Sequence, residues 1–273
     1  MDISNYHSLP LSIGGISALI SSGNLDFIAQ TEKRYANFIC PGTAPLLKIE
    51  VNILSEKMVS NLVTEMERPE VTFDYGTDRV TFVWQGLSGE LNLVSREARM
   101  RCPLHPTGLN SFLRFVYSLV LLKELGFLVH AAGLIKNEKG YIFPGKSGVG
   151  KTTIARLSPG ATLLSDDIPL VKTGGAPFIF GTPFWGDLAV GGEKTSAPLA
   201  GVYFPVKDKK SYTERLKPRQ VFEKLLPNVV FFFKNEKFSK QLFNLCFDLA
   251  TKVPGYELHF LPDPSFWEYI DAG

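Results

Sequence analysis

The chain has 273 residues, of which 45% are hydrophobic and 21% are charged, and its formal net charge at pH 7 is +2. This composition is that of a globular protein with a substantial core, and the small net charge excludes a global field that would attract nucleic acid or an anionic membrane. The three cysteines form no ligand-spaced pair, which indicates reduced thiols rather than a disulfide framework or a zinc site. Residues 1–7 lack the basic and apolar regions of a signal peptide, and no apolar run reaches the length of a membrane span, so a cytoplasmic protein is expected.

Residues 1–105 are expected to form a β-rich N-terminal region. Apolar and polar residues alternate in the clearest segment, which is the period of a half-buried strand. A turn at residues 76–79 separates two further strands, as in a hairpin. The four expected strands are Leu47–Ile53, Val71–Tyr75, Val80–Trp84 and Gly89–Val94. Nothing in this region indicates chemistry beyond that of a scaffold.

Residues 106–273 are expected to form a second domain, which begins with a helix over Asn110–Leu125. Asn110 is a suitable N-cap and Gly126 a suitable exit. The helix is apolar on nearly all sides, which predicts burial between layers. A membrane role is the alternative, but the run is short and contains Arg114 and Lys123.

The segments that follow alternate between strand and helix, which predicts an α/β fold. The expected order is a strand over Phe127–Ile135, a polar turn, a strand over Tyr141–Phe143, a short helix over Thr152–Leu157 and a strand over Ala161–Ser165. Pro159 and Gly160 stop the helix. Farther along, Phe238–Val253 has the spacing of a packing helix.

A phosphate-binding loop is predicted between the second of these strands and the short helix. Gly145, Gly150, Lys151 and Thr152 match G-x-x-x-x-G-K-[ST] at every fixed position. Glycines let successive backbone amides approach phosphates closely. Lys151 is expected at the β- and γ-phosphates of ATP, with Thr152 on magnesium. The expected nucleotide-binding residues are Gly145, Lys146, Ser147, Gly148, Val149, Gly150, Lys151, Thr152 and Thr153. A coincidental glycine-rich turn is the alternative, and the bare pattern arises in roughly one unrelated chain in a hundred.

Two acidic residues follow the last of these strands. Asp166 and Asp167 stand at its C-terminal end, where open α/β sheets place their ligands. Neighbouring residues of a strand point to opposite faces, so one carboxylate can hold magnesium while the other faces an acceptor hydroxyl. A turn or helix cap before Ile168 and Pro169 is the alternative. His130, considered alone, is more often a core residue than a catalyst.

Together these motifs resemble HPr kinase/phosphorylase-like serine kinases, whose phosphate-loop domain is related to phosphoenolpyruvate carboxykinase. The resemblance depends on three stretches: Val129–Gly133, Gly145–Thr152 and Leu164–Asp167. In the family, as here, a His-Ala-x-Gly element precedes the loop by one hairpin, and the aspartate pair follows after one short helix and one strand. The likeness runs from about residue 128 to 167, more loosely to about 204, and leaves the first hundred residues unmatched.

The resemblance implies an ATP- and magnesium-dependent kinase that phosphorylates a serine-type hydroxyl. It implies that Lys151 and Thr152 keep their phosphate and magnesium roles. It further implies that an acidic residue of the pair acts on the hydroxyl and that His130 tunes it. We expect Asp167 as metal ligand and Asp166 with His130 as the hydroxyl-handling group, and the two aspartates remain interchangeable at this stage.

The sequence also departs from the family pattern. Ala132 and Thr152 each replace a serine, and the downstream signature that grips HPr is missing. Instead, Gly181–Asp187 and Ser196–Leu199 look like the HPr kinase-related proteins of small gene cassettes that modify peptides or metabolites, including lasso-peptide clusters. HPr is therefore not the expected acceptor. The expected acceptor is a hydroxyl on another peptide, a protein or a small molecule.

The glycine-rich passage over residues 175–192 allows two interpretations. Trp185 and Asp187 line the acceptor site in one, with Glu193 and Lys194 near phosphate or magnesium. In the other, the passage is a surface loop with Trp185 in the core.

Three other functions remain open. They are phosphorolysis of a phosphoserine, carboxykinase chemistry on a small acid, and a non-catalytic nucleotide-binding module that gates a partner in a biosynthetic assembly. The acidic pair and the histidine favour an enzyme over a pure sensor. A homo-oligomer is compatible with the sequence, which does not determine the acceptor, the nucleotide preference or the purpose of residues 1–105.

Overall fold

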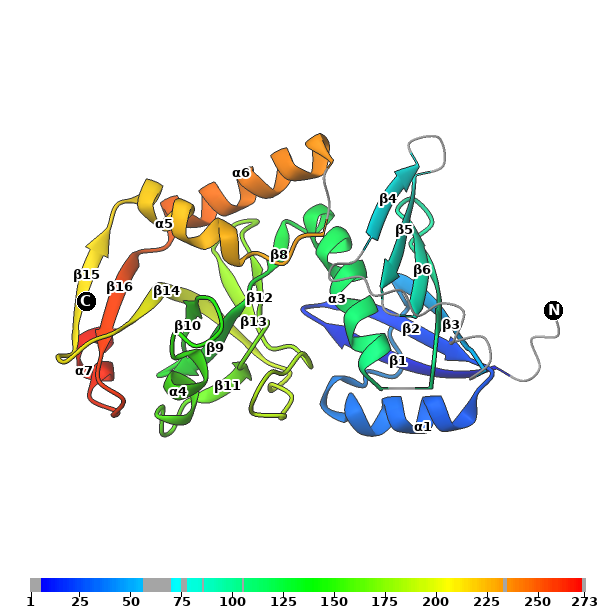
Figure 1. The fold of residues 1–273 in the computed structure, drawn as a ribbon, viewed down its shortest axis with the longest axis horizontal. Coiled ribbons are helices and arrows are strands. Elements are labelled where there is room, and N and C mark those ends of the chain that lie inside the picture. Colours follow the sequence, from blue (N-terminus) through cyan, green and yellow to red (C-terminus); the bar gives the residue numbers. More distant parts are fainter. Residues whose placement is uncertain are drawn as a thin grey trace. The chain divides into compact units, whose positions relative to one another are not determined.

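A computed structural model describes residues 6–55, 70–74, 78–84, 86–104, 106–232 and 235–271. The fold is mixed α/β (Figure 1). The chain divides into two units, Met1–Val120 with Phe231–Asn235 and Leu121–Val230 with Glu236–Gly273. The sequence places the division after residue 105, whereas the contacts in the structure place it after Val120, inside the helix Pro106–Lys123. Among the described residues, no helix combines the length and the apolar character that crossing a membrane requires.

The first unit contains a seven-stranded sheet in the order β1-β2-β3-β7-β6-β5-β4. Its strands are β1 (His7–Ile13), β2 (Ile16–Ser22), β3 (Leu47–Ile53), β4 (Glu70–Asp74), β5 (Arg79–Trp84), β6 (Leu87–Asn92) and β7 (Glu97–Cys102), and helices α1 (Leu25–Arg34) and η2 (Ala36–Phe38) follow β2. Strand β3 pairs in parallel with both β2 and β7, whereas the other pairs are antiparallel. The four strands expected here are confirmed to within two residues in the described part of the chain. Tyr75, the expected end of the second strand, and residues 76 and 77 of the expected turn lie outside the described residues.

Apolar residues on one face of this sheet pack against helix α3 (Pro106–Lys123). The predicted helix is confirmed, although it begins four residues earlier, at Pro106, which fits the first turn of a helix. Gly89 of β6 allows the close approach: a Cβ at this position would lie 2.3 Å from the Phe112 ring. Phe115 packs on Phe82 with ring centroids 4.6 Å apart. The expected burial of α3 is thus confirmed, and aromatic side chains make these contacts.

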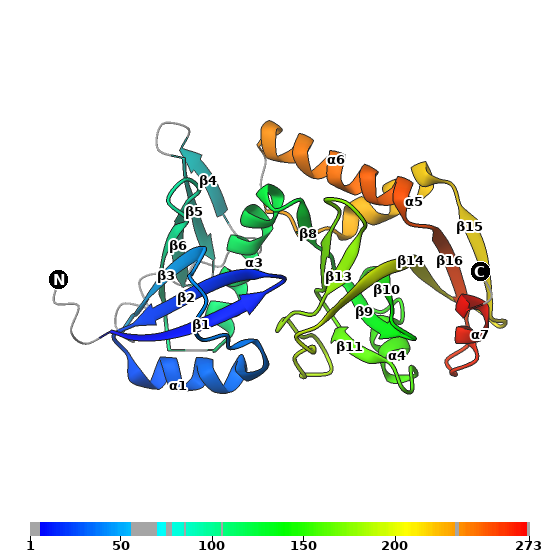
Figure 2. The ribbon, with the colours of Figure 1, turned by 180° about the vertical axis from the view of Figure 1, so that it is seen from behind.

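The second unit is built on a nine-stranded sheet (Figure 2). Its strands are β8 (Gly126–Leu128), β9 (Ala131–Lys136), β10 (Lys139–Pro144), β11 (Thr162–Ser165), β12 (Leu170–Lys172), β13 (Phe178–Phe180), β14 (Ser196–Lys207), β15 (Tyr212–Leu216) and β16 (Gly255–Phe260). The main path runs β11-β9-β10-β14-β13-β12-β8, and β16 pairs with β14 and β15. Its helices are α4 (Lys151–Arg156), α5 (Pro218–Leu225), η3 (Leu226–Asn228), α6 (Glu236–Lys252) and α7 (Phe266–Asp271). Strand β14 is parallel to both β10 and β16.

One expected strand is two strands in the structure. The apolar run Phe127–Ile135 breaks at Val129 and His130, so that β8 pairs with β12 while β9 pairs with β10 and β11. At the break, the His130 amide donates to the carbonyl of Asn228 at 2.6 Å. An uninterrupted run of apolar residues cannot show that the chain changes its neighbouring strands in the middle of the run. As a result, His130 lies just before β9 and not inside a paired strand.

The hydrophobic core of the second unit fixes helix α4, and with it the end of the predicted phosphate loop. Ile154 of α4 is fully buried in a cluster that includes Phe143, Phe266 and Trp267. The Trp267 indole donates to the Ser158 hydroxyl at 3.0 Å, and that hydroxyl donates to the Ile154 carbonyl at 2.6 Å. These contacts anchor the helix that begins at Lys151.

Candidate functional site

The segment 145–150 connects β10 to α4 in a tight loop whose backbone requires glycine. Gly148 and Gly150 have φ values of +85° and +114°, in the left-handed region that side chains disfavour. A Cβ on Gly150 would also lie 2.6 Å from the ring of Phe260 on β16. The Gly145 amide donates to the His130 carbonyl at 3.2 Å, which joins the start of the loop to the break between β8 and β9.

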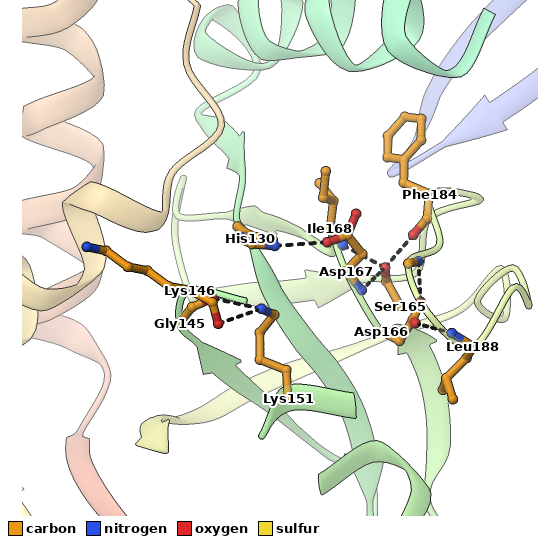
Figure 3. A network of polar contacts seen from close by, with 11 residues as sticks. His130, Gly145, Lys146, Lys151, Ser165, Asp166, Asp167, Ile168, Phe184 and Leu188 are labelled. Atoms are coloured by element: carbon orange, nitrogen blue, oxygen red, sulfur yellow. Dashed lines mark hydrogen bonds and ion pairs between the residues drawn. The ribbon is translucent and has the colours of Figure 1, made fainter. Parts of the chain in front are cut away.

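Lys151 is folded back onto this loop (Figure 3). Its ammonium donates to the carbonyls of Gly145 at 2.8 Å and Lys146 at 3.1 Å, and only 7% of the residue is exposed. Burial lowers the pKa of Lys151, and the carboxylates of Asp167, Asp187 and Asp166 oppose that shift. The loop therefore surrounds a cation that backbone oxygens and nearby carboxylates stabilise.

The remaining positions predicted to bind nucleotide vary in accessibility. Three of them are exposed at the tip of the loop and the others are half-buried: the exposed ones are Lys146, Ser147 and Gly148, and the half-buried ones are Gly145, Val149, Gly150, Thr152 and Thr153. Lys151 is the buried member of the set. This gradient leaves the outer part of the loop open to a ligand.

His130 and Asp167 form an accessible pair beside the loop. The Nε2 atom of His130 lies 3.0 Å from Oδ1 of Asp167, and the side chains are 38% and 18% exposed. The Asp167 carbonyl accepts from the Ala131 amide at 2.8 Å, so the start of β9 and the end of β11 hold the pair. A histidine and a carboxylate at this distance can accept and share a proton.

Asp166 occupies a different environment. Its residue is 2% exposed, and its carboxylate oxygens accept from the amides of Gly186 and Leu188, each at 2.9 Å (Figure 3). The expected pairing of Asp166 with His130 is therefore wrong: His130 lies against Asp167. The physical reason is the alternation of side chains along an extended segment, which turns the two carboxylates toward different surroundings.

Ser165 completes the attachment of the loop over residues 184–188, and the sequence reasoning did not select it. Its hydroxyl donates to the Phe184 carbonyl at 2.6 Å and accepts from the amides of Asp167 and Ile168 at 3.1 and 2.8 Å. A serine directly before two aspartates is a weak signal of such a turn. Together, Ser165 and Asp166 tie a loop twenty residues downstream to the end of β11.

The glycine-rich passage packs closely over this strand end. Cβ atoms on Gly181 and Gly192 would lie within 2 Å of the carbonyl oxygens of Glu193 and Leu164, at 1.8 and 1.7 Å. The Glu193 amide donates to the Leu163 carbonyl at 2.9 Å. The backbone of this passage therefore lies directly against β11 and against itself. Only glycine fits at these two positions, because a Cβ there would overlap a carbonyl oxygen.

The side chains of this passage differ in exposure. Asp187, Glu193 and Lys194 are exposed, whereas Trp185 is half-buried and lies beside Gly191, where an added Cβ would be 3.7 Å from its ring. Asp187 is close enough to Lys151 to act on its pKa. Asp187 therefore faces the same region as the phosphate loop, and Trp185 is packed at the base of its own loop.

Comparison with known proteins leaves the function to be argued from this geometry. No protein-family model matches the chain, and no curated protein gives a significant sequence match.

Proposed function

We propose that the chain is an ATP-dependent, magnesium-assisted serine-type kinase that transfers the γ-phosphoryl group to a hydroxyl on a peptide, a protein or a small molecule other than HPr. One observation carries the proposal. A loop with the full phosphate-binding pattern holds a buried lysine on its own carbonyls, and the His130–Asp167 pair stands at the neighbouring strand end. The resemblance to HPr kinase/phosphorylase-like proteins depends on the same residues.

The loop supplies the binding part of the proposed activity. Lys151 would exchange its two carbonyl partners for the β- and γ-phosphates, a stronger interaction because both partners are then charged. The residues present also fit magnesium, which prefers hydroxyl and carboxylate oxygens. Thr152 would hold it with the carboxylate of the exposed Asp187, which leaves Asp167 for the acceptor. The ion would neutralise charge that develops on the phosphoryl oxygens.

Asp167 with His130 is the group proposed to act on the acceptor. The acceptor oxygen forms its bond to the γ-phosphorus as the bond to the bridging oxygen of ADP breaks, and the hydroxyl proton passes to Asp167 or His130. Asp166 is unsuited to this step because both of its oxygens are buried against backbone amides. In this proposal Asp167 takes the hydroxyl-handling role first expected of Asp166, and Asp166 holds the loop over residues 184–188.

Nucleotide titration and phosphate transfer test the proposal in sequence. Calorimetry with Mg·ATP is expected to show binding by wild type, loss in Lys151→Ala, and near-normal binding in Asp167→Asn. Release of ³²P from [γ-³²P]ATP, and its transfer to an array of serine peptides, is expected to fall 10²- to 10⁴-fold in Asp167→Asn. Lys139→Ala, at the exposed first residue of β10 and at the opposite end of that strand from the loop, is the matched control.

Two outcomes would reject the proposal at different levels. Absence of Mg·ATP binding by wild type would remove any nucleotide-dependent function. Binding without hydrolysis or transfer, unchanged in Asp167→Asn, would instead favour the non-catalytic module that gates a partner.

A further inference from the structure

Strands β15 and β16 of the second unit lie side by side (Figure 1), and they carry a second cluster of ligand-type side chains. His259 and Glu257 are two residues apart on β16 and therefore share one face of the strand. Glu214 of β15 is the direct antiparallel partner of Glu257. Two glutamates placed opposite each other repel, and a cation between them would relieve that repulsion.

The spacing of the three side chains suits a small metal ion. One ligand atom from each of Glu214, Glu257 and His259 can be chosen so that all lie within 4.8 Å of one another. The His259 Nε2 atom and the Glu257 Oε2 atom are 3.5 Å apart. Two ligands of one tetrahedral zinc ion, at the usual bond lengths, are separated by about 3.4 Å. A zinc ion therefore fits between these two atoms with little movement.

The histidine is held in the orientation that a metal ligand needs. Its Nδ1 lies 2.8 Å from the Asp208 carboxylate, and its ring stacks on Tyr212 with centroids 4.2 Å apart. A carboxylate on Nδ1 fixes the tautomer and leaves the Nε2 lone pair for a metal. Within the described part of the chain, Nε2 is buried and has no hydrogen-bond partner, which is costly unless a ligand satisfies it.

The glutamate has a matching support. The Lys224 ammonium lies 2.6 Å from Oε1 of Glu257, so the carboxylate is anchored through one oxygen while Oε2 faces His259. Ligating carboxylates in metal sites are themselves hydrogen-bonded in this way. Asp208 and Lys224 thus orient the two inner ligands, and Glu214 supplies the third from the exposed side.

We propose that Glu214, Glu257 and His259 form a binding site for a divalent transition-metal ion, zinc in the first place. Imidazole with carboxylates is a donor set that zinc accepts readily, whereas magnesium and calcium prefer oxygen alone. The ion would relieve the repulsion between the paired glutamates and cross-link β15 to β16. On the other face of β16, Phe260 packs against Gly150, so the metal would stiffen the strand that supports the phosphate loop. This site is independent of the proposed kinase function, because the two sets of residues do not overlap.

Zinc titration of the full chain, stripped with a chelator, tests the proposal. Competition with a chromophoric chelator at pH 7.5 is expected to show one zinc per chain for wild type, and a loss of affinity of at least tenfold in Glu214→Gln and His259→Gln. Zinc is expected to raise the melting temperature of wild type but not of these variants. His7→Gln, at an exposed histidine in the other unit, is the matched control and is expected to bind zinc like wild type.

The design separates this proposal from its rivals. Glu214 is exposed, so Glu214→Gln is expected to fold even if His259→Gln does not. Failure of wild type to bind zinc would overturn the proposal, since the cluster would then be a network of charged and hydrogen-bonded side chains without a metal. Retention of zinc by Glu214→Gln and His259→Gln, with loss in His130→Gln, would overturn it by assigning the metal to the phosphate-loop side. Neither outcome decides whether the chain binds Mg·ATP, which is measured separately.

Discussion

Replacing Asp166 by asparagine tests whether this carboxylate positions the loop over residues 184–188. A positioning role predicts a loss in the free energy of unfolding. In the structure, the two oxygens of Asp166 accept the amides of Gly186 and Leu188, each at 2.9 Å, and the residue is 2% exposed. Asparagine keeps one acceptor oxygen but turns an NH₂ group toward the second amide, so one charge-assisted bond becomes neutral and the other becomes a contact between donors. Hydrogen bonds to charged groups contribute about 1.5–3 kcal/mol each, and a buried unsatisfied donor costs about 1–3 kcal/mol. We expect Asp166→Asn to lower the free energy of unfolding by about 2–4 kcal/mol.

Urea denaturation, followed by tryptophan fluorescence, measures this loss. Hydrogen exchange at the Gly186 and Leu188 amides locates it, because both amides are expected to lose protection in the variant. Asp167→Asn is the matched control: its pair with the partly exposed His130 is expected to contribute no more than about 1 kcal/mol. If Asp166→Asn unfolded at the wild-type urea concentration, with both amides still protected, the assignment of Asp166 as the anchor of this loop would be refuted.

Three further predictions concern the phosphate loop and the thiols. Gly150→Ala places a Cβ 2.6 Å from the Phe260 ring at a φ of +114°, so calorimetry is expected to show Mg·ATP affinity reduced at least tenfold; wild-type affinity would contradict this. Burial raises the pKa of the Cys102 and Cys246 thiols to about 12, so iodoacetamide at pH 8 is expected to label the half-buried Cys40 first, as read by mass spectrometry, and the other two only after unfolding. Because these raised values exceed the unfolded-state pKa, the stability that each thiol contributes is present below about pH 9 and lost as the pH rises toward 12. The free energy of unfolding, measured by urea denaturation above pH 9, is thus expected to fall by up to about 1.4 kcal/mol per pH unit for each thiol, and a flat profile would exclude the effect.

Local periodicity predicted those elements whose burial depends on their own residues. The alternation in Leu47–Ile53 gave β3 with its bounds, because Leu47, Ile49 and Val51 face the core. The helical spacing within Phe238–Val253 likewise gave α6. Both patterns report a single face packed against a core, which is the information that local sequence contains.

The first hairpin of the chain also has a local sequence signal. Strands β1 and β2 are joined by Gly14 and Gly15, with φ values of +57° and +77°. Two glycines between β-type runs are typical of a two-residue hairpin. By contrast, the parallel pairing of β14 with β10 and β16 depends on contacts between distant segments, for which the chain offers no local pattern.

The candidate site shows the same limit at the scale of two side chains. Alternation along the strand end predicted that the adjacent aspartates face different surroundings, and the structure confirms this, but the pattern left open which aspartate faces which. That choice depends on the position of residues 186–188, whose amides occupy both oxygens of Asp166. Once those oxygens are taken, only Asp167 of the pair has a partly exposed carboxylate beside His130. The surroundings of Asp166 are thus set by a loop twenty residues away in sequence, and a change in that loop would free the carboxylate of Asp166 without altering either aspartate.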